Sequence, residues 1–204
     1  DGKLRIEIWK RFLARNRIHP SNVIDIGCGD GSMAAQLASA QIGSRFTLVD
    51  LSPKAVEYVK VNPFPGLLEA TVGQVTSLPF PTQSFDLAVL SHVVEHVSEP
   101  REAVVEAARV ARYVLVEVPL EDAVISNLAS LIRKWVTGVP RSLASGVGHL
   151  HFYSVRSFRT VMLQWVELQI VDQLRYVPAS ASRGKHLLSR AGVKVYGSLL
   201  TTHL

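Results

Sequence analysis

The sequence predicts an α/β fold, in which a doubly wound, mostly parallel sheet of seven strands carries helices on both faces and has an antiparallel last strand. Short, nearly continuous apolar runs recur along the chain, and such runs are typical of parallel strands buried on both faces. Segments with helical apolar spacing separate most of these runs, as expected of parallel strands joined by crossover helices. A glycine-rich loop directly follows the first run, where a doubly wound sheet places its ligand.

The N-terminal segment predicts an amphipathic helix over residues 3–15, packed beside the first strand. The sequence His19-Pro20-Ser21 then ends it. The apolar residues at helical spacing are Leu4, Ile8, Trp9, Phe12 and Leu13.

The other elements follow in order. Strands are predicted at 22–26, 45–49, 68–72, 85–90, 112–118, 166–171 and 198–204. Helices are predicted near 31–41, 53–61, 99–110, 154–163 and 184–191, and a serine cap opens the fourth of these.

Composition predicts one soluble cytoplasmic domain that spans residues 1–204. The chain has 204 residues, 48% of them apolar, which is enough to bury a full core. A single cysteine excludes an internal disulfide framework. The absence of an 18-residue apolar run argues against a transmembrane segment. A homodimer is compatible with these properties.

The formal charge of +5 raises the question of an anionic partner. Lysines and arginines are scattered, however, and no run is longer than Arg133-Lys134. This pattern favours a solvated basic surface over a nucleic-acid interface.

Residues 121–153 predict a helical insertion. An apolar helical stripe from Val124 to Trp135 precedes a stretch rich in glycine, serine and proline at 137–148. The stripe fits either ordinary core packing or a lid over an apolar acceptor pocket, which the glycine-rich stretch would allow to move.

The glycine loop reads Asp25-Ile26-Gly27-Cys28-Gly29-Asp30-Gly31, and Asp50 ends the next predicted strand. An acidic residue at that place accepts hydrogen bonds from ribose hydroxyls, which indicates a nucleotide cofactor. The spacing is Gly-x-Gly-x-Gly, whereas a nicotinamide or flavin site has Gly-x-Gly-x-x-Gly. Asp25 would repel a pyrophosphate and attract a cationic amino-acid group. The ligand therefore combines an adenosine with a positive, non-phosphate end.

At this point the sequence resembles the class I S-adenosylmethionine-dependent methyltransferases, in their small-molecule type 11 branch. The segments that carry the resemblance are 25–31, 48–52, 73–80, 84–90, 92–97 and 111–119, in family order and spacing. The resemblance implies a Rossmann-like fold, S-adenosylmethionine as cofactor and S-adenosylhomocysteine as product.

The resemblance also implies the cofactor contacts. Gln74 departs from the family, which usually carries an aspartate there, but its side-chain carbonyl can still accept a bond from the adenine amino group. The alternative is that Gln74 faces solvent and Val75 offers only its backbone donor. The expected cofactor-binding residues are Asp25, Gly27, Cys28, Gly29, Gly31, Asp50, Leu51, Gln74, Val75 and Ser91.

Catalytic candidates follow the fourth strand, because ligands of a doubly wound sheet lie beyond the carboxyl ends of its strands. Ser91, His92, Glu95 and His96 stand there. His92 and His96 would share one face if the segment were helical, and either could serve as a neutral base near pH 7. The competing interpretation is that both histidines are structural, with Glu95 and His96 holding the turn.

A second histidine pair, His149 and His151, lies near the acceptor pocket by the same resemblance. Substrate contact is one interpretation, and a surface or capping role is the other. Two histidines at i and i+2 share one side of a strand, but no cysteine or nearby carboxylate completes a metal site, so we expect no metal.

The predicted function is methyl transfer to the oxygen or nitrogen of a small-molecule acceptor by in-line displacement. A nucleic-acid methyltransferase is one alternative. Ser91-His92-Val93-Val94 stands where amino-methylating enzymes of that class resemble one another in an Asn- or Asp-Pro-Pro-aromatic turn, and the only cysteine, Cys28, lies inside the cofactor loop. A non-catalytic module that binds S-adenosylmethionine is the other alternative.

Overall fold

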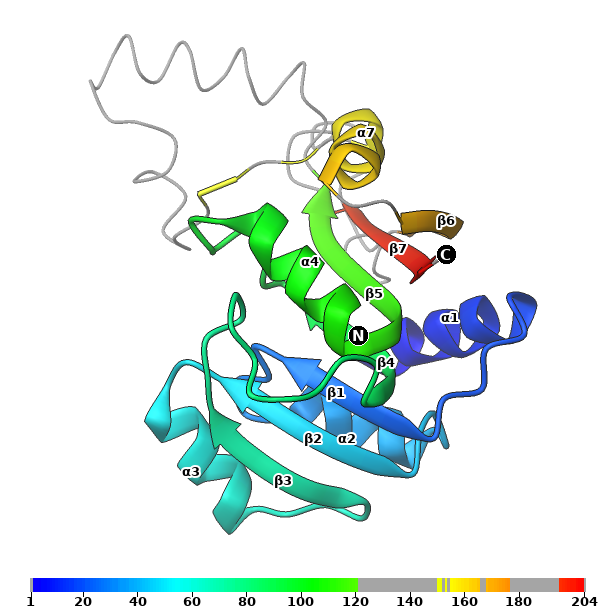
Figure 1. The fold of residues 1–204 in the computed structure, drawn as a ribbon. Helices are drawn as coiled ribbons and strands as arrows, with labels where there is room; N and C mark the ends of the chain where they lie inside the picture. Colours follow the sequence, from blue (N-terminus) through cyan, green and yellow to red (C-terminus); the bar gives the residue numbers. More distant parts are fainter. Residues whose placement is uncertain are drawn as a thin grey trace, which may run out of the picture.

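The computed structural model describes residues 2–120, 150–151, 153, 155–165, 168–176 and 195–203 (Figure 1). Its helices are α1 (Gly2–Arg15), α2 (Ser32–Ser39), α3 (Pro53–Val61), α4 (Pro100–Val110) and α7 (Val155–Trp165). Its strands are β1 (Asn22–Ile26), β2 (Arg45–Asp50), β3 (Leu67–Val72), β4 (Phe85–Ser91), β5 (Ala111–Leu120), β6 (Leu168–Tyr176) and β7 (Val195–His203).

Five parallel strands form the part of the sheet that carries the glycine loop. The full strand order is β3-β2-β1-β4-β5-β7-β6, and β1 lies between β2 and β4. The strands β1 to β5 pair in parallel, whereas β7 pairs antiparallel with both β5 and β6. The strand order reverses direction at β1 and β4, which is where a doubly wound sheet binds its ligand. The predicted α/β doubly wound fold is confirmed in this parallel part.

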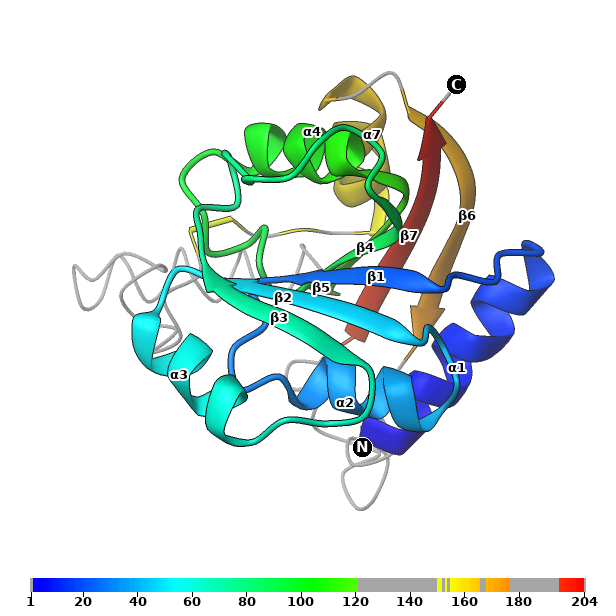
Figure 2. The ribbon, with the colours of Figure 1, turned by 60° about the horizontal axis from the view of Figure 1, so that its bottom comes forward.

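Two hydrophobic cores cover the two faces of the sheet, because each central strand is apolar on both sides. One core joins Ile24 and Ile26 of β1 to side chains of α4 and α7. The other joins Val23 of β1 to Trp9 of α1, Leu37 of α2 and further residues of α3. Figure 2 shows α1, α2 and α3 on one side of the sheet and α4 and α7 on the other.

The helix α1 follows the predicted amphipathic pattern with one correction. Trp9, Phe12 and Leu13 are buried as predicted. The prediction for Leu4 is wrong, since its side chain is 40% exposed, and Ile6 takes the buried place instead. The reason is the direction of the stripe, which follows the spacing of Ile6, Trp9 and Leu13 along one face of the helix.

No helix joins β3 to β4 in the described chain, and side chains of α4 brace this connection instead. The Arg109 guanidinium donates to the carbonyl oxygens of Leu78 (3.0 Å) and Phe80 (2.8 Å). Glu106 accepts from the backbone N–H of Leu78 at 2.7 Å and pairs with Arg109 at 2.7 Å. This pairing lowers the pKa of Glu106 and raises that of Arg109, so both groups stay charged.

Several predicted elements lie wholly or partly outside the described residues. The helix at 184–191 lies wholly outside them, and so does the lid at 121–153 except for residues 150, 151 and 153. The first residue of the helix at 154–163, the first two of the strand at 166–171 and the last of the strand at 198–204 also lie outside them. Among the helices that the structure does describe, none combines the length and apolar character needed to cross a membrane.

Candidate functional site

The candidate site lies at the carboxyl ends of β1, β2, β4 and β5. Side chains alternate between the two faces of a strand, so Asp25, Ser91 and Glu117 share the face of their apolar neighbours Val23, Val89 and Leu115. That face is the one covered by α1 and α2. Three polar side chains thus converge beneath the N-terminal helix.

The glycine loop turns sharply between β1 and α2. Gly27 has φ +72°, and its backbone N–H donates to the carbonyl oxygen of Val49 at 2.7 Å. A Cβ atom at Gly27 would lie 2.5 Å from Cγ2 of Val93, so a side chain there would collide with the turn after β4. Gly29 has φ +56°, and nothing lies within 4 Å of the place where its Cβ would stand. The loop is therefore packed on one side at Gly27 and open at Gly29. Gly31 forms the N-cap of α2.

Asp25 is a buried carboxyl group with an incomplete set of partners. It is 2% exposed, and its Oδ2 has no hydrogen-bond partner among the described residues. Burial raises the pKa of Asp25 to about 7, and the opposing attraction of Arg5 is the largest influence in the other direction. A cationic group placed beside Asp25 would favour its ionised form.

Asp50 links the glycine loop to the end of β2. Its Oδ2 accepts from the backbone N–H of Gly29 at 2.8 Å, and its Oδ1 accepts from Ser52 N–H at 2.8 Å. Each carboxylate oxygen can accept more than one hydrogen bond, so Asp50 retains capacity for hydroxyl donors. Leu51 beside it is 69% exposed, which offers an apolar surface to a flat ring.

The segment after β3 lies beside Asp50, because Gly73 N–H donates to the Asp50 carbonyl oxygen at 3.0 Å. Gln74 is exposed and closes a turn in which Ser77 N–H donates to its carbonyl oxygen at 3.0 Å. Val75 is partly buried and packs against the core that also contains side chains of α4. Both predicted adenine contacts thus stand next to the predicted ribose contact.

Cys28 turns its side chain away from the open side of the loop. The thiol belongs to the core beneath α1 and α2 and is 7% exposed. Burial and nearby carboxylates raise the pKa of Cys28, so the thiol stays protonated. Only the backbone of Cys28 faces the loop, and its N–H donates to the Val49 carbonyl oxygen at 3.1 Å.

His92 directly follows β4 in a left-handed backbone conformation, with φ +58°. Such a conformation is costly for a residue with a side chain and clusters at functional sites. Its Nδ1 lies 3.0 Å from Oε1 of Glu95, and its Nε2 lies 3.8 Å from Oε2 of Glu117. Because a carboxylate can only accept, Nδ1 carries the proton in this contact. The ring is 33% exposed, whereas both carboxylates are fully buried.

The segment from His92 to Val97 is a turn and not a helix. The condition under which His92 and His96 would share one helical face is therefore not met, and the left-handed backbone at His92 is the reason. His96 is exposed, and its N–H donates to the Val93 carbonyl oxygen at 2.9 Å. The structure brings His92 into the polar cluster and leaves His96 at the surface.

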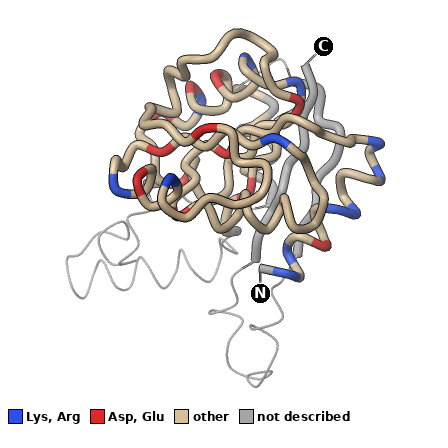
Figure 3. The backbone as a smooth tube through the Cα atoms, turned by 90° about the horizontal axis from the view of Figure 1, so that it is seen from below, with Lys and Arg blue, Asp and Glu red and all other residues tan. Residues whose placement is uncertain are grey.

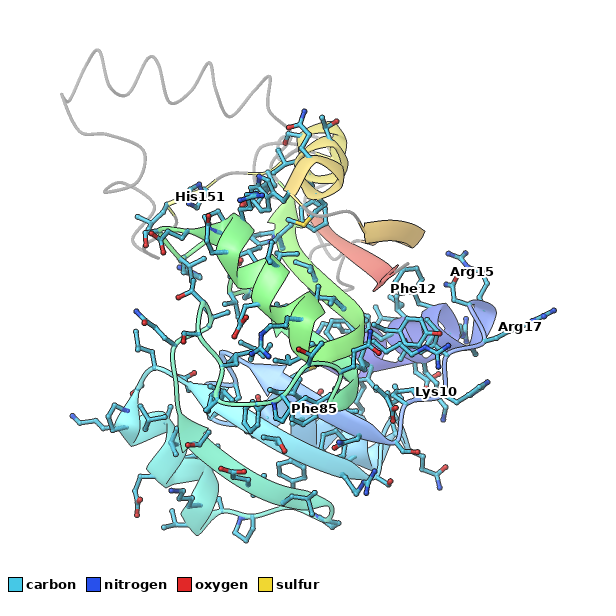
Figure 4. The ribbon with its side chains drawn as sticks, in the orientation of Figure 1. Lys10, Phe12, Arg15, Arg17, Phe85 and His151 are labelled. Carbon is cyan, nitrogen blue, oxygen red and sulfur yellow. The ribbon has the colours of Figure 1, made fainter. Side chains whose placement is uncertain are left out.

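His151 lies beside the same turn, and Figure 4 labels it. The backbone N–H groups of Leu150 and His151 both donate to the Glu95 carbonyl oxygen, at 2.8 and 3.1 Å. The His151 Nε2 donates to the Val97 carbonyl oxygen at 2.9 Å. His149 lies outside the described residues.

Glu117 on β5 and Arg5 on α1 complete the cluster. Glu117 is fully buried, and its Oε2 accepts from the Ser91 hydroxyl at 2.7 Å. The same oxygen lies 3.4 Å from NH1 of Arg5. Tyr153 is also buried near Glu95, and burial together with the charge of Glu95 raises the pKa of its hydroxyl.

The sequence contained a signal for both residues that were missed. Glu117 interrupts the apolar run from Tyr113 to Val118, as Asp25 interrupts the first strand. Arg5 stands four residues before Trp9 and eight before Leu13, on the apolar stripe of an amphipathic helix. A charge on a buried face is informative because it needs a partner.

The outer face of α1 is basic and separate from this cluster. Lys10, Arg15 and Arg17 point away from the sheet in Figure 4, and lysines and arginines follow the helix in Figure 3.

Within the described part of the chain, no group of three or more histidine, cysteine, aspartate or glutamate residues could hold a metal ion.

Comparison with known proteins shows which proteins this chain resembles. Residues 24–113 match the model of a family described as "Methyltransferase domain". The chain is 31% identical over 93 residues to a malonyl-[acyl-carrier protein] O-methyltransferase of Hahella chejuensis, which covers 46% of this chain and 33% of that protein. It is 33% identical over 96 residues to a norajmaline N-methyltransferase of Rauvolfia serpentina, with 45% and 32% covered.

The matched part spans about a third of the length of these relatives. The fold is also similar to that of a magnesium protoporphyrin IX methyltransferase from Synechocystis PCC 6803 with bound S-adenosylhomocysteine. The TM-score is 0.64 at 15% identity, and the likeness covers 97% of this chain and 82% of that one. The glycine loop, Asp50 and the turn after β4 all fall inside residues 24–113. The similarity to methyltransferases therefore lies in residues 24–113, the part of the chain that contains the candidate cofactor site.

Proposed function

We propose that this protein transfers the methyl group of S-adenosylmethionine to an oxygen or nitrogen of a small-molecule acceptor. The observation that carries the proposal is the part-exposed His92 ring, held by Glu95 at the carboxyl end of β4. The names of the two relatives, an O-methyltransferase and an N-methyltransferase, support this range of acceptor atoms. We treat residues 1–204 as one domain, with 121–153 as a lid on the acceptor side.

The cofactor end of the site fits an adenosine joined to a cationic amino-acid group. Asp25 offers a buried carboxyl oxygen without a partner to the ammonium. Gly29 leaves open space where the ligand approaches the loop, and Asp50 offers hydrogen-bond acceptors to the ribose. The exposed Leu51 side chain supports an adenine ring. Gly27, Cys28, Gly31, Gln74, Val75 and Ser91 complete the proposed contacts.

The protein groups have a limited chemical task in this reaction. S-adenosylmethionine supplies a methyl group on a sulfonium, which is already an activated leaving group. The protein must therefore align the acceptor atom with that methyl and remove a proton from a hydroxyl or amine. We assign the second role to the imidazole of His92, because the ring is part-exposed at the carboxyl end of β4 and Glu95 holds it in place.

The other histidines receive secondary roles in this proposal. His96 is exposed after the turn and is proposed as an acceptor-side contact at the mouth of the site. His151 has its Nε2 engaged by the Val97 carbonyl oxygen, so only Nδ1 is offered to an acceptor. The same role is proposed for His149.

The decisive experiment incubates the purified protein with S-adenosylmethionine labelled at its methyl group, together with a metabolite extract or total RNA. We expect label in small molecules of the extract. Label in RNA would redirect the proposal to nucleic acid, and intact cofactor binding without any labelled product would leave only the non-catalytic function.

A matched pair of variants then tests the base. His92→Gln should lower kcat by at least about a hundredfold, because general base catalysis contributes roughly 10²–10⁴. His96→Gln changes the exposed histidine of the same turn, which we propose as an acceptor contact and not as the base, so this variant should raise KM and retain most of kcat. Equal losses in the two variants would contradict the assignment of His92.

A further inference from the structure

One guanidinium stands between two buried carboxylates that belong to different parts of the site. Arg5 extends from α1, with its side chain 24% exposed. Its NH1 lies 3.4 Å from Oε2 of Glu117 on β5. Its charge also lowers the pKa of Asp25 on β1, more than any other group does. A contact between residues 112 positions apart thus connects the N-terminal helix to β5, and the charge of Arg5 reaches Asp25 on β1.

Arg5 forms an ion pair with Glu117, whereas no hydrogen bond joins Arg5 to Asp25 in the described chain. Glu117 also accepts from Ser91 at 2.7 Å, which fixes its carboxylate. Asp25 consequently has a buried oxygen without a donor although a cation is nearby.

The other groups that face Asp25 do not lower its pKa enough to offset the effect of burial. A hydrogen bond from the backbone N–H of Ala34, in the first turn of α2, favours the ionised form. Asp50 of β2 and Asp30 of the loop both disfavour it, and the buried thiol of Cys28 stays protonated. Burial outweighs the favourable contacts and raises the pKa of Asp25 to about 7.

We propose that Arg5 is a positioning residue of the cofactor site. Because Arg5 stays in its ion pair with Glu117, Asp25 can exchange its proton for the ammonium of the bound cofactor. The proton leaves to solvent and the ammonium takes its place beside the carboxylate. This inference rests on the proposed contact between Asp25 and the amino-acid end of the ligand.

Proton release on ligand binding measures this exchange directly. With an Asp25 pKa of about 7, the empty protein carries about 0.9 of a proton on this group at pH 6, about 0.5 at pH 7 and about 0.1 at pH 8. Calorimetric titration with S-adenosylhomocysteine, in buffers of different ionisation enthalpy, should therefore show a release that falls in this order. Titration with 5′-methylthioadenosine, which lacks the amino-acid end, should show almost none.

Three variants separate the role of Arg5 from a merely structural one. Arg5→Gln removes the cation, so Asp25 should keep its proton to higher pH and release at pH 8 should exceed the wild-type value several-fold. Arg5→Lys keeps the charge and should restore a release close to that of the wild type. Glu117→Gln frees Arg5 for Asp25, and the release at pH 7 should fall.

The outcomes distinguish this inference from the proposed function. Failure of the wild type to bind S-adenosylhomocysteine would overturn the assignment of the site itself. Tight binding without proton release, or equal release in wild type and Arg5→Gln at every pH, would overturn the inference and leave the function standing. Thermal unfolding of each variant, and its affinity for 5′-methylthioadenosine, report whether the fold and the adenosine end are intact.

Discussion

The buried carboxyl of Asp25 should make the stability of the ligand-free protein depend on pH in an unusual direction. The pKa of Asp25 rises from 3.8 to about 7 on folding, so the folded state binds this proton more tightly than the unfolded state. The resulting stabilisation is complete below pH 3.8 and is lost as pH rises to about 7. At about 1.4 kcal/mol per pKa unit, ionised Asp25 destabilises the folded protein by as much as about 4 kcal/mol above that pH.

Asp25→Asn replaces the carboxyl by a neutral group of the same shape and removes this cost. We expect the variant to unfold at higher urea concentration than the wild type at pH 8.5. Below pH 3.8 the two proteins should have almost equal free energies of unfolding, because Asp25 is then protonated in both the folded and the unfolded state. Tryptophan fluorescence follows the transition, since Trp9 is fully buried.

Asp30→Asn is the matched control in the same loop. The Ser32 N–H donates to the Asp30 carboxylate at 3.0 Å and lowers its pKa, so ionised Asp30 stabilises the fold. This variant should lose stability at neutral pH, in the opposite direction to Asp25→Asn. Parallel curves of stability against pH for the wild type and Asp25→Asn would refute the reasoning.

Three further predictions concern packing and ligand contacts. Gly27→Ala should lower the free energy of unfolding by about 2–4 kcal/mol, because the new side chain combines a left-handed backbone with overpacking against Val93. Adding Val93→Ala should recover part of this loss in urea titrations. No recovery would show that backbone strain alone is responsible. Arg109→Leu removes charged hydrogen bonds worth about 2 kcal/mol, so the midpoint of thermal unfolding should fall by about 4–8 °C. An unchanged midpoint would show that these hydrogen bonds to Leu78 and Phe80 contribute nothing to stability. Asp50→Asn should weaken S-adenosylhomocysteine binding tenfold or more in a thermal-shift titration, and unchanged binding would contradict the ribose assignment.

The parallel half of the fold was predictable because its signals are local. Strands β1, β4 and β5 are short apolar runs, and the glycine loop and Asp50 stand at fixed distances within one strand-helix-strand unit. The boundaries of β1 and α3 coincide with the predicted ranges, whereas β5 continues past its prediction to Leu120. The extended end of β5 pairs with β7, and no local sequence pattern predicts this pairing.

The acceptor side was less predictable because it depends on contacts between distant segments. The ion pair of Arg5 with Glu117 crosses 112 positions, and the contact of Glu95 with residues 150 and 151 crosses more than 50. The left-handed backbone at His92 has no local signal either, because it accompanies a hydrogen bond from the His92 N–H to the Glu117 carbonyl oxygen. Tertiary contacts decided these positions against the local pattern.

The backbone at His92 carries a consequence for how this protein can change. Glycine adopts a φ near +58° without steric cost, whereas histidine loses roughly 1 kcal/mol there. Glycine at position 92 would relieve that cost, but it would also remove the imidazole contact of the buried Glu95 carboxylate, which costs more. The strained backbone and the side chain that it presents are therefore coupled, and neither can be changed without the other.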